Sequence, residues 1–92
     1  MGKVTITLYG ALAKTAGEKT TSIEAPTLKE AIDALIAKYG ESFKGRVYDQ
    51  NDRLLRFLNI YINGKDIRFL NNLNTELKDN DAISLIPAVG GG

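Results

Sequence analysis

The chain has 92 residues, of which 43% are hydrophobic and 25% charged, and its 12 basic and 11 acidic side chains give a formal net charge of +1. This length fits one domain, and a charge so close to zero predicts neither a nucleic acid nor an anionic membrane as partner. The sequence has no cysteine and no histidine, which excludes disulfides, thiol nucleophiles, thiolate or imidazole metal sites and the commonest general base. We therefore expect no metal site, and the chemistry open to the chain is severely limited.

No apolar run approaches the roughly 20 residues that span a bilayer, and the start of the chain enters a strand pattern without an apolar leader. A cytoplasmic location is the default expectation.

The first part of the chain predicts two strands around a short glycine-bracketed segment. Residues 3–9 alternate with period two and direct one set of side chains to the core: Val4, Ile6 and Leu8. Residues 10–17 indicate a loop or a single helical turn, anchored by Leu12. Residues 18–24 are rich in Thr and Ser and predict a polar edge strand that returns beside the first and stops before Pro26.

A capped helix is predicted next. Thr27 and Glu30 have the spacing in which the threonine oxygen accepts from an early N–H and the glutamate reaches back to the cap. One helical face is apolar: Leu28, Ala31, Ile32, Leu35, Ile36 and Tyr39. Gly40 stands where a left-handed C-terminal residue is wanted. The pattern is typical of a core helix with a solvated charged face and indicates no further role.

Residues 41–56 have no sustained period and predict an irregular connection with one helical turn at most. Asp49 and Asp52 raise the alternative of a cation site. The calcium-loop spacing is missing, however, and short acidic residues around Gln50 and Asn51 favour a simple turn.

The last third predicts a hairpin and a final strand. Residues 57–62 alternate with Leu58, Ile60 and Ile62 inward, and Asn63-Gly64 is typical of a primed hairpin turn before a short return strand over 65–68. A loop over 70–77 and a turn over 78–81 lead to the final strand, 82–86. The element order predicts an α+β roll of four to five strands with one main helix across it. The first and last strands should pair in parallel at its centre.

The chain ends on residues 87–92, a proline followed by Ala88, Val89 and three glycines, which we expect to form a tail behind a domain of residues 1–86. Without Cβ atoms, Gly90, Gly91 and Gly92 could thread a partner's channel that larger side chains would block, with Pro87 marking the end of the strand ladder. Taken alone, such an ending is equally consistent with a cloning scar or a frayed terminus.

Several motifs, read together, resemble the MoaD/ThiS family of β-grasp sulfur carriers, typified by the small subunit of molybdopterin synthase and related to ubiquitin. The resemblance covers nearly the whole chain and is carried by Tyr9-Gly10-x-Leu12-Ala13-x-x-Ala16-Gly17, the capped helix, Ile62-Asn63-Gly64, Leu77-Lys78-Asp79-Asn80-Asp81 and the ending Leu85-Ile86-Pro87-x-Val89-x-Gly91-Gly92. Two departures are Asn80, where a glycine is usual, and the length of the 41–56 segment. Asn also adopts left-handed conformations, so the first is tolerable.

The resemblance implies a β-grasp fold and a carrier that is not an enzyme alone. An E1-like enzyme of the MoeB/ThiF type, using ATP and Mg²⁺, would adenylate the Gly92 carboxylate, which would then become a thiocarboxylate. The sulfur recipient would be a molybdopterin synthase large subunit of the MoaE type. Two alternatives stay open: a carrier for thiamin or tRNA thiolation, and a ubiquitin-like modifier joined through Gly92 to lysines of target proteins. A plain binding module with an incidental tail is the third reading.

Strand alternation also predicts a partner interface. Tyr9, Phe57, Tyr61 and Ile86 should lie on the sheet face opposite the helix-covered core, and several apolar residues on a solvent face suggest a docking surface. In a threaded complex the tail residues Pro87, Val89, Gly90 and Gly91 would continue this contact. The alternative is that these are ordinary scattered exposed side chains.

Overall fold

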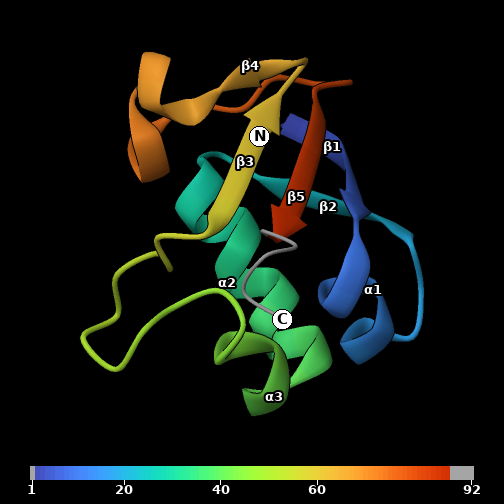
Figure 1. Cartoon of the computed structure of the whole chain (residues 1–92). Coiled ribbons are helices and arrows are strands. Elements are labelled where there is room, and N and C mark those ends of the chain that lie inside the picture. Colours follow the sequence, from blue (N-terminus) through green and yellow to red (C-terminus); the bar gives the residue numbers. More distant parts are fainter. Residues whose placement is uncertain (1, 88–92) are drawn as a thin grey trace.

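The computed structural model describes residues 2–87 and shows a five-stranded sheet with the order β2-β1-β5-β3-β4. Figure 1 shows the main helix, α2, lying across one face of this sheet, and α1 beside the end of β5. The elements are β1 (Gly2–Leu8), α1 (Gly10–Ala16), β2 (Thr20–Ala25), α2 (Leu28–Tyr39), α3 (Glu41–Lys44), β3 (Leu58–Ile62), β4 (Lys65–Asp66), the short 3₁₀ helices η1 (Ile67–Phe69) and η2 (Asn72–Asn74), and β5 (Ala82–Pro87).

The first and last strands pair in parallel, as predicted, with Leu8 opposite Leu85. β2 runs antiparallel to β1, and β3 runs antiparallel to β5. Because side chains alternate across a strand, one face of the sheet meets α2 and is buried. Its residues are Val4, Ile6, Leu8, Ile60, Ile62, Ile83 and Leu85.

α2 begins at the predicted cap. The Thr27 hydroxyl oxygen accepts from the Glu30 N–H at 3.4 Å, and the same hydroxyl donates to the Glu30 carboxylate at 3.0 Å. The glutamate thus reaches back to the cap, as predicted, and its partner there is the threonine side chain. Gly40 ends the helix at φ +93°, and its N–H donates to the Ile36 carbonyl. The predicted apolar face is buried at Leu28, Ala31, Ile32 and Leu35.

The 10–17 segment is a two-turn helix, α1, where a loop or single turn was predicted. Leu12 is fully buried, and Ala13 and Ala16 pack against the core. Gly17 closes the helix at φ +78°. The reason is tertiary: a helix of seven residues is too short to be stable alone, even with three alanines, and the burial of Leu12 supplies the stability.

The return strand over 65–68 was also predicted too long. Only Lys65 and Asp66 pair with β3. Asp66 then accepts from the Arg68 N–H and starts η1, which turns Ile67 into the core. The final strand runs one residue further than expected, because Pro87 pairs with Leu58.

The 41–56 segment is irregular, as predicted, but it contributes to the core. Phe43 in α3 is buried, and so are Val47 and Tyr48, which follow this helix. A backbone bridge between Tyr48 and Leu54 closes the segment on itself. Asp49 forms the turn by accepting from the N–H groups of Asn51 and Arg53. Within residues 2–87 no cluster of three acidic or other metal-ligating side chains occurs, and none of the helices described there could cross a membrane.

Candidate partner surface and tail exit

Pro87 is the last described residue, and the geometry around it fixes the direction in which the chain leaves the sheet. It pairs with Leu58 on one side. On the other side Gly10 comes so close that a Cβ at this position would lie 3.2 Å from the Pro87 Cγ. Gly10 has φ +56°, a conformation that favours glycine. The predicted tail residues Val89, Gly90, Gly91 and Gly92 lie outside the described residues.

Two of the four predicted interface residues, Tyr61 and Ile86, lie in strands on the face away from α2. Their neighbours in sequence, Ile60, Ile62 and Leu85, are buried on the helix side, so Tyr61 and Ile86 point the other way. Ile86 stands opposite Asn59, and Tyr61 stands opposite Ser84. Both side chains are half-buried.

The other two, Tyr9 and Phe57, lie just beyond strand ends. Tyr9 follows β1 and precedes α1, and its N–H donates to the Leu85 carbonyl at 3.2 Å. Phe57 precedes β3, next to the residue that pairs with Pro87. Their exposed fractions are 44% and 65%. Register therefore brings Tyr9, Phe57 and Ile86 to the end of the sheet at which β5 terminates, whereas Tyr61 lies further back on the same face, next to the β3–β4 hairpin. Whether these residues bind a partner stays a prediction.

Most of the other side chains on this open face are polar or charged, among them Lys3, Thr5, Thr7, Ser22, Glu24, Asn59 and Ser84. At its edge Arg68 and Asp66 form an ion pair of 2.7 Å. The hydrogen bond from the Arg68 guanidinium, together with that from the Arg68 N–H, lowers the pKa of the Asp66 carboxyl. The apolar patch thus has a charged rim, the arrangement that protein interfaces commonly have.

Sequence reasoning missed one exposed aromatic residue. Phe69 in η1 is 81% exposed, more than any other large apolar side chain among the described residues. Strand alternation could not place it, because the strand ends at Asp66 and the Asp66 cap turns the chain. The signal available in the sequence was that cap, an Asp two residues before Arg68.

The described face combines apolar and polar side chains with one ion pair at its edge. Apolar groups surrounded by a polar rim are typical of contact surfaces between proteins.

Comparison with known proteins identifies the class to which this architecture belongs. The structure superposes with a TM-score of 0.89 on small archaeal modifier protein 1 from Methanosarcina acetivorans, at 32% identity and with 100% and 98% of the two chains covered. It superposes with a TM-score of 0.84 on a chain in the BexX/CysO complex of Amycolatopsis orientalis, at 34% identity, covering 97% and 99%. The fold is the ubiquitin-like β-grasp roll, as predicted.

The ThiS family model matches residues 6–92. The chain belongs to this family. Among curated proteins, the sulfur carrier protein CysO of Mycobacterium tuberculosis is 39% identical over 80 residues, which cover 85% of each chain. These findings confirm the family resemblance and, through the family, the expectation that the chain is a carrier rather than an enzyme by itself.

Proposed function

We propose that this chain is a sulfur carrier that works through the carboxylate of Gly92. The carrying observation is that the ThiS family match runs to residue 92, through the glycine ending. The names of its relatives support the same role, since CysO of M. tuberculosis is called a sulfur carrier protein. The absence of cysteine agrees, because the chain cannot hold sulfur as a persulfide.

The proposed chemistry needs two partner-catalysed steps. A carboxylate is a poor electrophile, so an E1-like enzyme of the MoeB/ThiF type would first join the Gly92 carboxylate oxygen to the α-phosphorus of ATP, releasing pyrophosphate with the help of Mg²⁺. A sulfide ion supplied by a partner would then attack the acyl carbon and displace AMP, which leaves a thiocarboxylate. The first step transfers an adenylyl group to the carboxylate and the second transfers the acyl group to sulfide, so neither step involves a redox change.

The chain's own part in these steps is positioning. The open face, with Ile86, Tyr61, Tyr9 and Phe57, would bind the activating enzyme, and the Gly10–Pro87 contact would aim the tail at its active site. From Pro87 to Gly92 the chain reaches roughly 20 Å when extended, enough to enter a channel. The proposal includes a cytoplasmic setting, where ATP is available.

Intact-mass measurement of the protein isolated from its host tests this function. We expect a fraction whose mass has increased by one sulfur-for-oxygen exchange, and loss of that fraction when Gly92 is deleted. Glu76→Gln, an exposed change in the loop before β5, is the control. A species that stays entirely carboxylate during active sulfur flux would contradict the proposal.

For the sulfur recipient we propose a molybdopterin synthase large subunit of the MoaE type. Its test is transfer in vitro from the thiocarboxylated chain to the host's large subunit and substrate. If sulfur goes instead to a different host enzyme captured on the thiocarboxylated chain, the recipient is wrong and the carrier function stands.

A second candidate function is protein modification through Gly92. It is favoured by the similarity to the M. acetivorans protein, which is named a modifier. Proteolysis of host extracts followed by a search for glycine remnants on lysines distinguishes the two functions. Remnants that depend on this chain would support modification, and a search that finds none while the thiocarboxylate is present would exclude it.

A further inference from the structure

The sheet has one long open edge, which is formed by β2. This strand pairs with β1 along all six of its residues, and no strand among residues 2–87 pairs with it on the other side. The opposite edge of the sheet is different, because β4 contributes only two residues there and the chain then turns into η1. β2 is therefore the edge at which a further strand can be added.

The direction of the backbone polar groups along β2 follows from one hydrogen bond. The Leu8 N–H donates to the Lys19 carbonyl at 2.7 Å, so the backbone groups of Lys19 point towards β1. Because this direction alternates along a strand, every second residue of β2 points its N–H and C=O groups away from the sheet. These residues are Thr20, Ser22 and Glu24. The turns and loops of residues 2–87 supply no hydrogen-bond partner for these groups.

β2 also lacks most of the features that protect an edge strand from pairing. Its six pairs with β1 follow one another without a bulge. Proline occurs only after its last residue, at Pro26, and Glu24 is the one charged residue within the strand. Protected edges are commonly short, interrupted by a bulge or a proline, or rich in charge. The edge formed by β2 is thus long and regular enough to pair.

We propose that β2 pairs with β2 of a second copy of this chain, antiparallel and around a twofold axis at Ser22. The two five-stranded sheets would then form one continuous sheet. In this register Ser22 lies opposite Ser22 of the second copy, and Thr20 lies opposite Glu24. Each such pair exchanges two backbone hydrogen bonds, so the twofold arrangement would pair every outward N–H and C=O group of both strands.

The charges and the proline near β2 select this register over its neighbours. A shift by two residues in one direction would place Glu18 opposite Glu24 of the other copy, which brings like charges together. A shift in the other direction would place Pro26 opposite Thr20, and proline has no N–H to donate. The Pro26 carbonyl is also engaged already, since it accepts from the Leu77 N–H at 2.9 Å.

The side chains of β2 fit the same arrangement on both faces. On the helix-covered face Ile23 is half-buried and packs against the core. It would lie opposite Thr21 of the second copy, with the other Ile23 as its diagonal neighbour, so its remaining exposed surface would be covered. On the open face the two Ser22 hydroxyls would meet, and the Glu24 carboxylate would meet the Thr20 hydroxyl. No like charges would lie opposite each other.

The charges at the two ends of α2 favour a second copy over an unrelated strand. α2 runs back along β2, because it begins shortly after Ala25 and, near its end, Lys38 donates to the Thr21 hydroxyl oxygen at 2.7 Å. The twofold axis would therefore bring the last turn of one α2 to the side of the first turn of the other. The first turn carries Glu30 and the last turn carries Lys38, so opposite charges would face each other at both ends.

Sedimentation equilibrium of the full chain tests the proposal. The pair should be weak, because a strand edge buries less surface than a standard interface. We therefore expect the average mass to rise from that of one chain, 10.0 kDa, towards that of two as the protein concentration increases. A mass of one chain at every concentration that stays soluble would overturn the proposal.

Amide hydrogen exchange locates the contact. The N–H groups of Thr20, Ser22 and Glu24 should exchange rapidly in dilute samples. They should exchange about fivefold more slowly once about four fifths of the chains are paired, because only the free chain exchanges at these positions. The N–H groups of Thr21 and Ile23, which point towards β1, should be slow at both concentrations. Protection that appears elsewhere, with none at the three outward groups, would overturn the proposed edge.

A charge at the twofold axis should break the pair. Ser22→Lys would place two ammonium groups opposite each other and should weaken dimerisation about tenfold or more. Ala82→Lys, which adds the same group at an exposed position of β5 on the same sheet face, is the matched control and should dimerise like the wild type. Thermal unfolding of dilute samples establishes that both variants are folded. Equal dimerisation of the two variants would overturn the proposal.

The tail has no part in this contact. Deletion of Gly92 should leave dimerisation unchanged, so this outcome is separate from that of the sulfur-carrier proposal. Loss of the dimer on this deletion would overturn the pairing through β2.

Discussion

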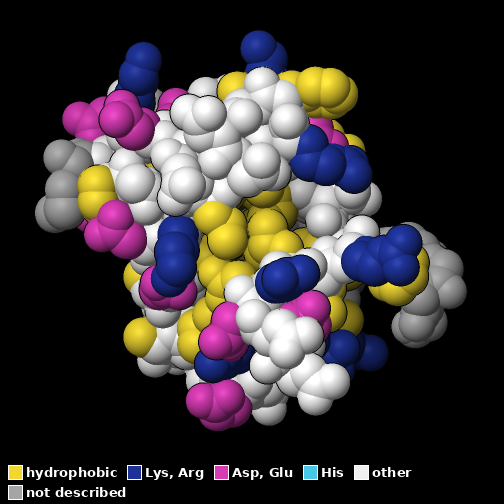
Figure 2. All heavy atoms as spheres, turned by 90° about the vertical axis from the view of Figure 1, so that its left-hand side faces the viewer, with side chains coloured by type: hydrophobic (Ala, Val, Ile, Leu, Met, Phe, Trp, Pro, Cys, Tyr) yellow, Lys and Arg dark blue, Asp and Glu magenta, His cyan; other side chains and the backbone are white. Residues whose placement is uncertain are grey.

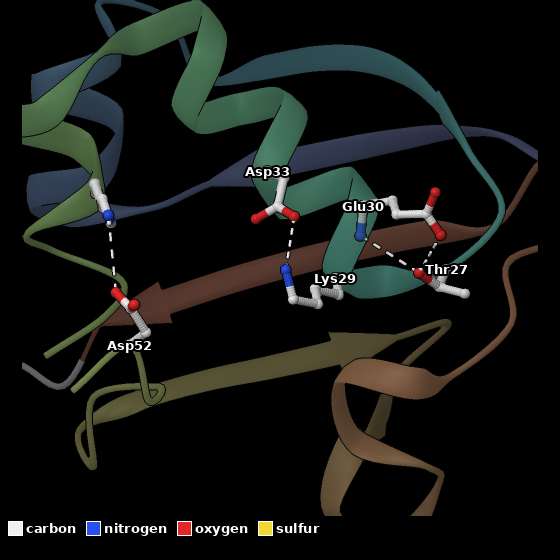
Figure 3. A network of polar contacts seen from close by, with 6 residues as sticks. Thr27, Lys29, Glu30, Asp33 and Asp52 are labelled. Carbon is white, nitrogen blue, oxygen red and sulfur yellow. Dashed lines mark hydrogen bonds and ion pairs between the residues drawn. The ribbon is translucent and has the colours of Figure 1, made fainter.

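The end of β5 at Pro87 and the groove lined by α2, α3 and the 48–52 segment lie in different parts of one small domain and are held by different forces. At the end of β5, Pro87 pairs with Leu58, and a Cβ at Gly10 would lie only 3.2 Å from the Pro87 Cγ. The groove, seen in Figure 2 as a hollow with apolar side chains at its bottom, depends on side chains, because its rim is formed by ion pairs that are more than one third exposed (Figure 3). Strand register is hard to shift without moving buried residues, whereas screened ion pairs exchange easily. The end of β5 is therefore the more rigid of the two regions.

The largest expected effect is the loss of stability when a buried side chain of α3 is removed. Phe43 in α3 is fully buried, with its ring centroid 5.1 Å from that of Tyr39. Phe43→Ala should destabilise the protein by about 3–5 kcal/mol because it removes apolar contact and leaves a cavity. Urea denaturation measures the loss.

The matched control is Phe57→Ala, the same change at a side chain that is 65% exposed. It should alter stability by less than about 0.5 kcal/mol. Similar losses for both variants would mean that α3 contributes no more to the core than the exposed edge of β3.

The next effect concerns binding at the exit. Ile86→Lys should weaken affinity for an activating enzyme or synthase about tenfold or more, because a charge would enter an apolar contact. Calorimetry measures the affinity, and the fold should be retained because Ile86 is on the open face. Ala82→Lys, at the far end of the same strand and exposed, should bind normally. Unchanged affinity of the Ile86 variant would remove this residue from the interface.

A smaller effect is expected from two glycine substitutions, which together distinguish backbone strain from contact with Pro87. Gly10→Ala and Gly17→Ala both introduce a Cβ at positive φ, +56° and +78° respectively, and each should cost about 1 kcal/mol. Only the Cβ at position 10 would press on Pro87, since nothing lies within 4 Å of the corresponding atom at position 17. Gly10→Ala should therefore also slow thiocarboxylate formation. Equal rates for the two variants would show that the contact does not aim the tail.

The smallest effect is acid dependence. The pKa of Asp66 is lowered mainly by the Arg68 guanidinium, and that of Glu18 by hydrogen bonds from Tyr39 and then Lys38. A lowered folded pKa adds stability that is complete above the ordinary values, 3.8 and 4.5, and is lost as pH falls below them. Thermal unfolding at several pH values should therefore show a decline below about pH 4.5. Asp66→Asn keeps the η1 cap and should make that decline shallower; an unchanged acid profile would contradict the assignment.

Much of the fold could be predicted because its signals are local. Alternation gave the inward sets of β1, β3 and β5, Thr27 gave the start of α2, and Asn63-Gly64 gave the hairpin, with Asn63 at φ +53°. Asn80 stands at φ +72°, so its departure from the usual glycine keeps the same turn.

The predictions that were wrong or missing concern structure that depends on contacts between residues distant in the sequence. α1 exists because Leu12 is buried, and the core role of Phe43 arises from its position under α2. The groove beside α2 could not be predicted, since its walls come from α2, α3, the 48–52 segment and η2, which no sequence period connects.

By itself, the sequence determined the class of fold, the family and the chemistry open to the chain. Hydrophobic periodicity predicts each helix or strand from its own residues. Because the chain has no cysteine and no histidine, the terminal carboxylate is the natural candidate for carrying a covalently bound group. Only the tertiary structure decided which residues meet at Pro87 and which side chains of the short segments enter the core. Pro87 pairs with Leu58 and lies against Gly10, and Leu12 and Phe43 are buried. Both depend on which residues meet across the folded chain, and a single sequence does not encode that in any local pattern.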